Sequence, residues 1–173
     1  MPEAAHLLLS LAMTGSGRCL EVWPRVAELL PARAEDYRSS VRGAFYYVDA
    51  VCHGAELLGR PEAVPILRDI HGRPCLRGQW RREGIDRDFL PERMAILELG
   101  LGRALARCGS REGLEILAEY LDDVRAVLAE YAHTTLHRLT GRDFGKDRAR
   151  WTEWIGRLPA EIPPSPISDR PWW

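Results

Sequence analysis

Three stretches of this chain begin with a glycine and then follow one pattern of residue sizes. A small residue stands four places after each glycine, and large apolar residues stand five, seven and eight places after it. The glycines are 44 and 50 residues apart, an interval typical of stacked helical hairpins rather than of a closed enzyme core. The pattern therefore predicts a repeated helical unit, whose copies lie at residues 15–23, 59–67 and 109–117.

Apolar residues between these glycines recur three and four places apart, the spacing of one helix face. One run predicts a helix from about Asp36 to Leu58, which Gly59 ends as a C-cap. Pro61 suits the first turn of the next helix, where its missing N–H removes no hydrogen bond. The expected inward residues of this hairpin are Val41, Phe45, Val48, Cys52, Ala55, Val64, Leu67 and Ile70.

The same spacing predicts three further helical pairs. Gly109 separates the two helices of the third pair. Asp122 and Asp123 are placed to cap the first helix of the fourth pair, and Asp147 is placed to cap its second helix. The expected inward residues are Leu8, Leu11, Ala12, Leu20, Trp23, Ala27 and Leu30 in the first pair; Met94, Leu97, Leu101, Ala104, Cys108, Leu114, Leu117 and Leu121 in the third; and Leu128, Ala132, Leu136, Leu139, Trp151, Trp154, Ile155 and Leu158 in the fourth.

Eight helices account for almost the whole chain, and no stretch alternates apolar and polar residues convincingly enough for a sheet. We therefore expect an all-α fold, an α-α superhelix (solenoid) of about four antiparallel helical pairs. A chain of 173 residues with 46% hydrophobic content suits one domain, here residues 1–158. Two stretches lie outside the helices: a linker over residues 72–91, and a proline-rich extended tail over residues 159–173.

Charge and cysteine content argue against several classes of function. The chain has 24 basic and 25 acidic residues, so no overall field attracts it to nucleic acid or to an anionic membrane. The four cysteines are far apart and form no C-x-x-C pair, which argues against a zinc site and favours a reducing cytoplasm. No stretch reaches the roughly 20 apolar residues that a membrane-spanning helix needs. We expect a cytoplasmic protein without a cofactor.

The chain resembles the HEAT-repeat family over nearly its whole length. Val41-Arg42 and Val124-Arg125 are similar to the Val-Arg pair that such repeats carry early in a first helix. They stand 17 or 18 residues before a glycine. The first unit lacks this pair, and the third has Met94-Ala95 in its place.

The closing segment carries the sharper resemblance. Residues 139–154 place a Leu-Thr-Gly turn before a Trp-x-x-Trp helix, which resembles the ending of many bacterial HEAT-repeat proteins. Residues 106–109 and 120–125 are similar to runs in repeat modules appended to bacterial FAD-dependent oxidoreductases. The resemblance implies a curved scaffold that binds proteins, or sometimes nucleic acid, with no chemistry of its own.

The long linker is the first candidate for a binding element. It places Trp80 among Arg77, Arg81 and Arg82, and both residue types are frequent at interface hot spots. Trp80 could instead fold back over the edge of the repeats. Arg68, on the preceding helix, is a further partner-binding candidate.

The tail is the second candidate, because it ends in Trp172 and Trp173. Two exposed indoles would promote non-specific association, so we expect them to dock either along the protein's own last repeat or into a partner. The shortened first pair also looks incomplete, and we expect its exposed face to pack on another domain or subunit.

Histidines provide the candidates for a metal site. His133 and His137 are four places apart, which puts both rings on one helix face, but Thr134 replaces the glutamate of an H-E-x-x-H motif. His53, Glu56 and His71 form a second conceivable cluster. Two ligands alone do not make a site, so we expect ordinary surface or groove-lining histidines and no catalytic residue.

Residues 100–105 begin like a dinucleotide-binding loop, Gly-Leu-Gly-Arg-Ala-Leu. That fingerprint needs a preceding strand and a third glycine, whereas these residues lie inside a helical stripe. We expect Gly100 and Gly102 to let a neighbouring helix approach closely. Any flavin-binding domain would then lie elsewhere in a longer protein or on a partner.

The leading hypothesis is a non-catalytic protein-interaction scaffold that forms a module or subunit of a larger bacterial, oxidoreductase-associated protein. The alternative is a nucleic-acid-binding protein with the architecture of HEAT-like DNA glycosylases, which needs a basic concave face. A metal enzyme that uses the histidines is a third hypothesis. The arginines available for a basic stripe are Arg68, Arg77, Arg81, Arg82 and Arg103.

Overall fold

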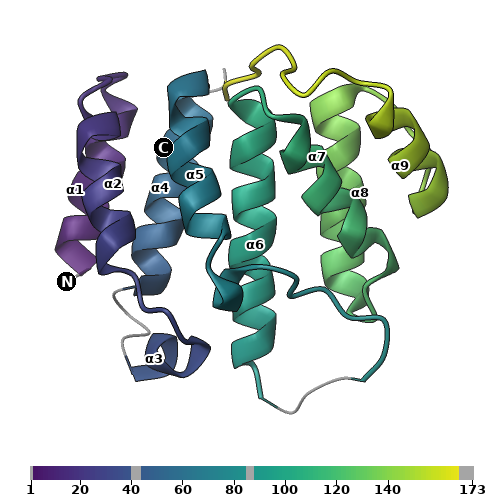
Figure 1. The fold of residues 1–173 in the computed structure, drawn as a ribbon, viewed down its shortest axis with the longest axis horizontal. Helices are drawn as coiled ribbons and strands as arrows, with labels where there is room; N and C mark the ends of the chain where they lie inside the picture. Colours follow the sequence, from purple (N-terminus) through teal and green to yellow (C-terminus); the bar gives the residue numbers. More distant parts are fainter. Residues whose placement is uncertain (1, 40–43, 85–87, 168–173) are drawn as a thin grey trace.

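The computed structural model describes residues 2–39, 44–84 and 88–167. This part of the chain is all-α, with nine α-helices and three short 3-10 turns (Figure 1). No helix within it is long and apolar enough to cross a membrane. The helices are α1 (Pro2–Met13), α2 (Cys19–Leu29), α3 (Ala34–Ser39), α4 (Ala44–Leu58), α5 (Val64–His71), α6 (Leu90–Arg107), α7 (Arg111–Glu119), α8 (Ala126–Thr140) and α9 (Arg148–Gly156), and the turns are η1 (Pro61–Ala63), η2 (Pro74–Leu76) and η3 (Tyr120–Asp122).

The helices pack with antiparallel contacts in an order that follows the sequence. Helices α1, α4, α6 and α8 contact one another in turn, while α2 contacts α5 and α7 contacts α9. The longest helix, α6, stands in the middle of the molecule with α7 beside it (Figure 1). Most helices thus bury their apolar stripes against helices that are not their neighbours in sequence, while α6 and α7 pack closely as a consecutive pair.

The core consists of two apolar clusters that share α6. Leu97 and Leu101 on α6 belong to a cluster with helices α1 to α5. Ala95 and Leu99, also on α6, belong to a second cluster with α7, α8 and α9. Most of the inward residues expected from the spacing are buried; Leu11, Leu20, Phe45, Val64, Leu139, Trp154 and Leu158 are only partly buried against the clusters, and Val41 lies outside the described residues.

The glycine boundaries are confirmed. Gly15, Gly59 and Gly109 all adopt positive φ angles, of 71°, 56° and 95°. This left-handed region is open to glycine at little steric cost. The Gly59 N–H donates to the carbonyl of Ala55 at 2.8 Å, which ends α4 as predicted.

The expected single helix from Asp36 to Leu58 was wrong. The structure has two helices there, α3 and α4, and residues 40–43 between them lie outside the described part. Tyr37 on α3 is buried in the first cluster, and α3 contacts α6 as well. The buried tyrosine therefore anchors a separate short element instead of extending α4.

The expected caps of the fourth pair are half right. Asp147 caps α9 by accepting the Arg150 N–H at 3.0 Å. At α8 the N-cap position is Arg125, because Asp122 ends the 3-10 turn that continues from α7. Asp123 accepts the Arg125 N–H at 2.8 Å but lies before the helix. The pair Val124-Arg125 likewise precedes α8, and Val41-Arg42 lies outside the described residues.

Of the two glycines of α6, only Gly102 permits the close helix approach that the sequence predicted for both. Gly102 faces α7, where a Cβ would lie 2.9 Å from Ile116 Cγ2. Gly113 on α7 in turn faces the backbone of Gly102 and Ala106. Close approach of α6 and α7 therefore explains Gly102, whereas Gly100 only reaches ordinary contact distance with Cys52 on α4.

Candidate functional site

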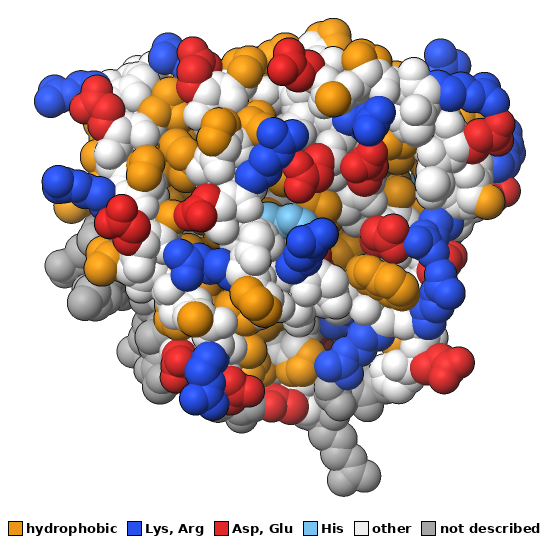
Figure 2. Space-filling view, in the orientation of Figure 1, with side chains coloured by type: hydrophobic (Ala, Val, Ile, Leu, Met, Phe, Trp, Pro, Cys, Tyr) orange, Lys and Arg blue, Asp and Glu red, His pale blue; other side chains and the backbone are white. Residues whose placement is uncertain are grey.

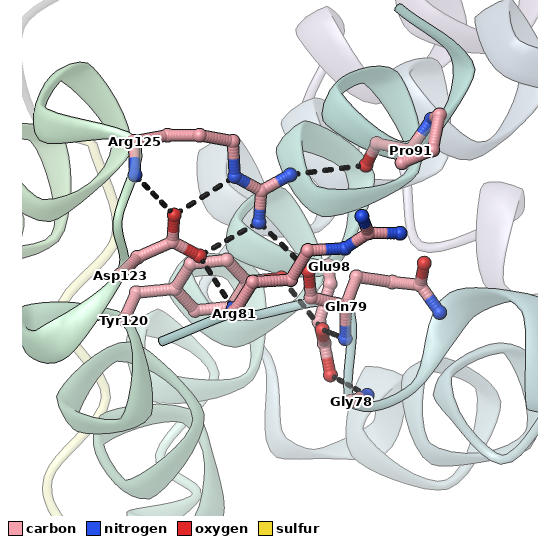
Figure 3. Close-up of polar contacts among 8 residues, drawn as sticks. All are labelled: Gly78, Gln79, Arg81, Pro91, Glu98, Tyr120, Asp123 and Arg125. Carbon is pink, nitrogen blue, oxygen red and sulfur yellow. Dashed lines mark hydrogen bonds and ion pairs between the residues drawn. The ribbon is translucent and has the colours of Figure 1, made fainter. Parts of the chain in front are cut away.

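A buried carboxylate holds the start of the long linker against the helices. Glu98 on α6 accepts the N–H groups of Gly78 and Gln79, each at 2.7 Å (Figure 3). The same carboxylate accepts the Tyr120 hydroxyl at 2.6 Å and lies 3.0 Å from His71 Nε2. Burial alone would raise the pKa of Glu98, but these hydrogen bonds hold that pKa below its usual value. Glu98 is therefore an ionised anchor for the linker.

A second acidic residue holds the next part of the linker. Asp123 accepts the Arg81 N–H at 3.0 Å (Figure 3). The Val124 N–H donates to the Arg81 carbonyl at 2.7 Å. The Arg125 guanidinium binds Asp123 and also donates to the Gln79 carbonyl at 2.7 Å. Although burial opposes it, the Arg125 bonds lower the pKa of Asp123. Linker and η3–α8 junction thus form one hydrogen-bonded unit.

Trp80 lies between these two anchors. Its side chain is half-buried and packs against the second apolar cluster. The guanidinium carbons of Arg82 and Arg148 lie 5.3 Å and 5.6 Å from the centre of its ring, within cation–π range. The structure therefore places Trp80 as a cover over the cluster, one of the two arrangements that the sequence left open.

Other arginine candidates also have partners within the chain. Arg68 donates to Glu112 at 2.7 Å, and Arg103 is paired with the buried carboxylate of Glu56 at 2.8 Å. Arg77 is exposed. Figure 2 shows basic and acidic side chains interspersed over one face of the molecule. Phosphate binding needs a local positive surplus, so this distribution gives little support to the nucleic-acid hypothesis.

The remaining tail candidates, Trp172 and Trp173, lie outside the described residues. The preceding tail, residues 159–167, contains no helix and lies against the ends of α4 and α6. It runs back across the second and third pairs instead of packing only on the last one.

The histidine candidates bind nearby groups of the chain. His133 Nε2 lies 3.1 Å from Asp143, and His137 Nδ1 lies 2.9 Å from the Arg142 carbonyl. Both therefore hold the turn after α8. His53, Glu56 and His71 do not form a metal-binding group, because no cluster of three or more His, Cys, Asp or Glu suited to a metal occurs within the described residues.

A different surface carries the exposed large apolar side chains of the central helices. We call it the aromatic face, and it spans α4, α6 and α8. Three of its apolar residues are exposed by 44–76%: Tyr46 on α4, Ile96 on α6 and Val127 on α8. Phe89, just before α6, is 59% exposed, and Tyr131 on α8 is 36% exposed.

Two arginines of α6 connect the aromatic face across the helices. Arg93 lies over the rings of Phe45 and Phe89, at 5.5 Å and 5.2 Å. Arg103 lies over Tyr131 at 5.6 Å. Arg93, Ile96 and Arg103 are spaced three and seven places apart, so they share one side of α6. Through these two arginines, α6 is linked to rings of α4 and α8, its neighbours on either side.

The sequence patterns indicated the linker and the tail as binding elements and did not predict this face. The available signal was an apolar residue beside the inward stripe, such as Ile96 between Met94 and Leu97. Glu98 and Tyr120 were also missed, since a carboxylate within a helical stripe carries no mark of its burial.

No protein-family model, curated protein or solved structure matches this chain. The helices establish an all-α protein, and membership of the HEAT-repeat family stays a prediction.

Proposed function

We propose that this chain is a non-catalytic helical scaffold that binds another protein through the aromatic face. The observation that carries the proposal is the exposure of Tyr46, Ile96 and Tyr131 on three successive helices that contact one another. Exposed contiguous apolar patches mark interaction sites, and tyrosine and arginine are enriched in the residues that contribute most binding energy.

The arrangement of charges supports a binding role over chemistry. Glu98, Asp123 and Glu56 are buried, and each is bonded to groups of the chain that fix its position. The two arginines of the aromatic face are held over aromatic rings, so their side chains are partly ordered before a partner arrives. Preordered side chains reduce the entropic cost of association.

The architecture that we propose for this scaffold is a HEAT-like superhelix. Successive contacts from α1 to α4, α6 and α8 support it, as does the recurrence of a left-handed glycine at the ends of α4 and α6. The partner is then another protein or a domain fused to this module, such as the oxidoreductase that the closing segment suggests.

The test compares capture by wild-type protein with capture by two variants. The face variant carries Tyr46→Ser and Tyr131→Ser, and the control variant carries Leu29→Ser, a change at an 84% exposed residue on α2. Captured proteins are identified, purified and titrated directly against each variant. We expect the face variant to weaken binding by at least about tenfold, and Leu29→Ser to bind normally unless the partner packs on the first helical pair, the other surface that the sequence suggests.

Equal binding by the face variant would exclude the aromatic face as the binding site. Loss of binding by Leu29→Ser alone would instead place the partner on the first helical pair, where Leu7 and Met13 are also exposed.

A further inference from the structure

The described part of the tail follows one end of the helical array. After α9 it turns back past the α6–α7 junction and reaches the end of α4 (Figure 1). Ser110 and Glu161 form an isolated antiparallel bridge along this path. The tail thus lies in a groove, which we call the hinge groove, formed by the junction at Gly109 and the junction at Gly59.

The hinge groove recognises the tail mainly through its backbone. The N–H groups of Ile162, Ser165 and Ile167 donate to carbonyls of Gly109, Arg107 and Glu56, at 2.8, 2.8 and 2.9 Å. Arg107 and Glu56 stand in the last turns of α6 and α4, where carbonyls lack partners within the helix. An extended segment supplies the missing donors at the spacing required.

Further donors from α6 and α7 strengthen the same contacts. The Arg107 guanidinium donates to the Ser165 carbonyl at 2.8 Å and pairs with Glu56 at 3.3 Å. The Arg111 N–H donates to the Ala160 carbonyl at 3.0 Å. Since these donors bind backbone carbonyls, this part of the recognition does not depend on the side chains of the tail.

The two hinge glycines lie against prolines of the tail. A Cβ on Gly59 would lie 2.5 Å from Pro166 Cβ, and one on Gly109 would lie 3.3 Å from Pro164 Cγ. The glycines therefore form two flat sites into which proline rings fit. Ile162 packs against the second apolar cluster and fixes the register.

The tail leaves part of the groove unfilled. A pocket of about 350 Å³ lies between the tail and the helices, with Leu114, Leu139 and Trp154 among its apolar lining residues. Pro163 and Pro164 form part of its wall on the tail side. A segment with a bulkier side chain at this point would gain contacts that the tail does not make.

We propose that the hinge groove is a recognition site for extended, proline-containing segments of another protein, with the chain's own tail as its resident occupant. The segment that fits has an apolar residue, two prolines, one further residue, a proline and an apolar residue, as residues 162–167 do. Preformed extended segments bind with a low entropic cost. The site uses helix ends rather than the aromatic face, so it does not depend on the function proposed above.

The test titrates a labelled peptide with the sequence of residues 159–167 against full-length protein. In a tail-released variant, Ile162→Asp removes the apolar anchor and Ser165→Pro removes an N–H donor, while the groove is untouched. We expect this variant to bind the peptide at least about tenfold more tightly than wild type, because its own tail no longer competes. A scrambled peptide should not bind.

Two glycine variants in the tail-released background distinguish an effect on the groove from an effect on folding. Gly109→Ala should abolish binding, because its Cβ would lie 2.7 Å from the Ile162 carbonyl oxygen. Gly141→Ala should bind normally, because Gly141 also has a positive φ but no atom lies within 4 Å of its Cβ position. Equal binding by both variants would overturn the proposal.

Hydrogen exchange in wild-type protein gives a measurement that does not depend on variants. Saturating peptide should expose the amides of Ile162, Ser165 and Ile167, while the Gly141 amide stays protected. Failure of the peptide both to bind the folded tail-released variant and to expose these amides would refute the proposed site.

Discussion

Pro166 lies directly against Gly59, so that a Cβ on the glycine would be 2.5 Å from the Cβ of the proline. The glycine therefore meets two requirements: a left-handed backbone that ends α4, and a surface flat enough for the tail. Gly141, at the end of α8, meets only the first, because nothing lies within 4 Å of its Cβ position. Comparing Gly59 with Gly141 therefore allows the two requirements to be measured separately.

Gly59→Ala should destabilise the protein more than Gly141→Ala. Each variant forces alanine into the left-handed region, at a cost of about 1–2 kcal/mol. Only Gly59→Ala also displaces Pro166 and weakens the bond from the Ile167 N–H to the Glu56 carbonyl, which adds about 1 kcal/mol. Urea unfolding measures the difference, and equal losses would show that the tail contributes nothing to stability.

Glu98→Ala should be among the most destabilising single changes. The change leaves the Tyr120 hydroxyl and the N–H groups of Gly78 and Gln79 without a hydrogen-bond acceptor. Breaking such a buried charged network costs about 3–5 kcal/mol. The free energy of unfolding tests this, with hydrogen exchange of Gly78 and Gln79 as a local measurement.

Glu115→Ala is the matched control for Glu98→Ala. Glu115 is a half-exposed glutamate that pairs with Arg111 four places earlier on one helix. Such a surface pair contributes about 0.5 kcal/mol or less. If both variants lost the same stability, Glu98 would not be the anchor of the linker.

The advantage of wild type over Glu98→Gln should shrink in acid. Burial opposes ionisation of Glu98, but hydrogen bonds from His71 and Tyr120 hold its folded pKa below the usual value. Its contribution is therefore full above the unfolded pKa, about 4.3, and is lost as the pH falls through the folded pKa. Unfolding free energies from pH 7 down to pH 3 check this, and a constant difference would contradict it.

The four cysteines should resist alkylation in the folded protein. All are buried, and burial raises the pKa of Cys108 to about 12 and that of Cys52 well above its usual value. The reactive thiolate is therefore scarce near neutral pH. Mass measurement after iodoacetamide treatment at pH 8 should show no addition to native protein and four to unfolded protein. Rapid labelling of native protein would show local opening.

Much of the fold could be predicted from the sequence because packed helices carry apolar residues at a regular spacing of three and four places. Leu67, Leu101 and Leu136 are buried where the three-and-four spacing placed them, and Gly59 and Gly109 end helices as expected. The separation of α3 from α4 has no such signal in the sequence. Tyr37, Val41 and Phe45 continue the four-residue spacing, so periodicity alone predicts an unbroken helix.

The sites were harder to predict because they depend on residues far apart in the chain. Glu98 and Gly78 are twenty places apart, and Pro166 reaches Gly59 from the other end of the sequence. An arginine and tryptophan cluster predicts an interface only if its side chains are free. Here Arg82 and Arg148 lie over Trp80 and help to hold it against the core.

Trp80→Ala should therefore reduce stability, whereas Tyr131→Ala should not. Trp80 packs against the second apolar cluster, and truncating a half-buried tryptophan costs about 2–3 kcal/mol. Tyr131 is on the exposed aromatic face, where substitutions usually change stability by about 0.5 kcal/mol or less. Urea unfolding of both variants measures the two costs. A stable Trp80→Ala variant that loses its protein partner would assign Trp80 to the interface, and the linker would replace the aromatic face as the binding element.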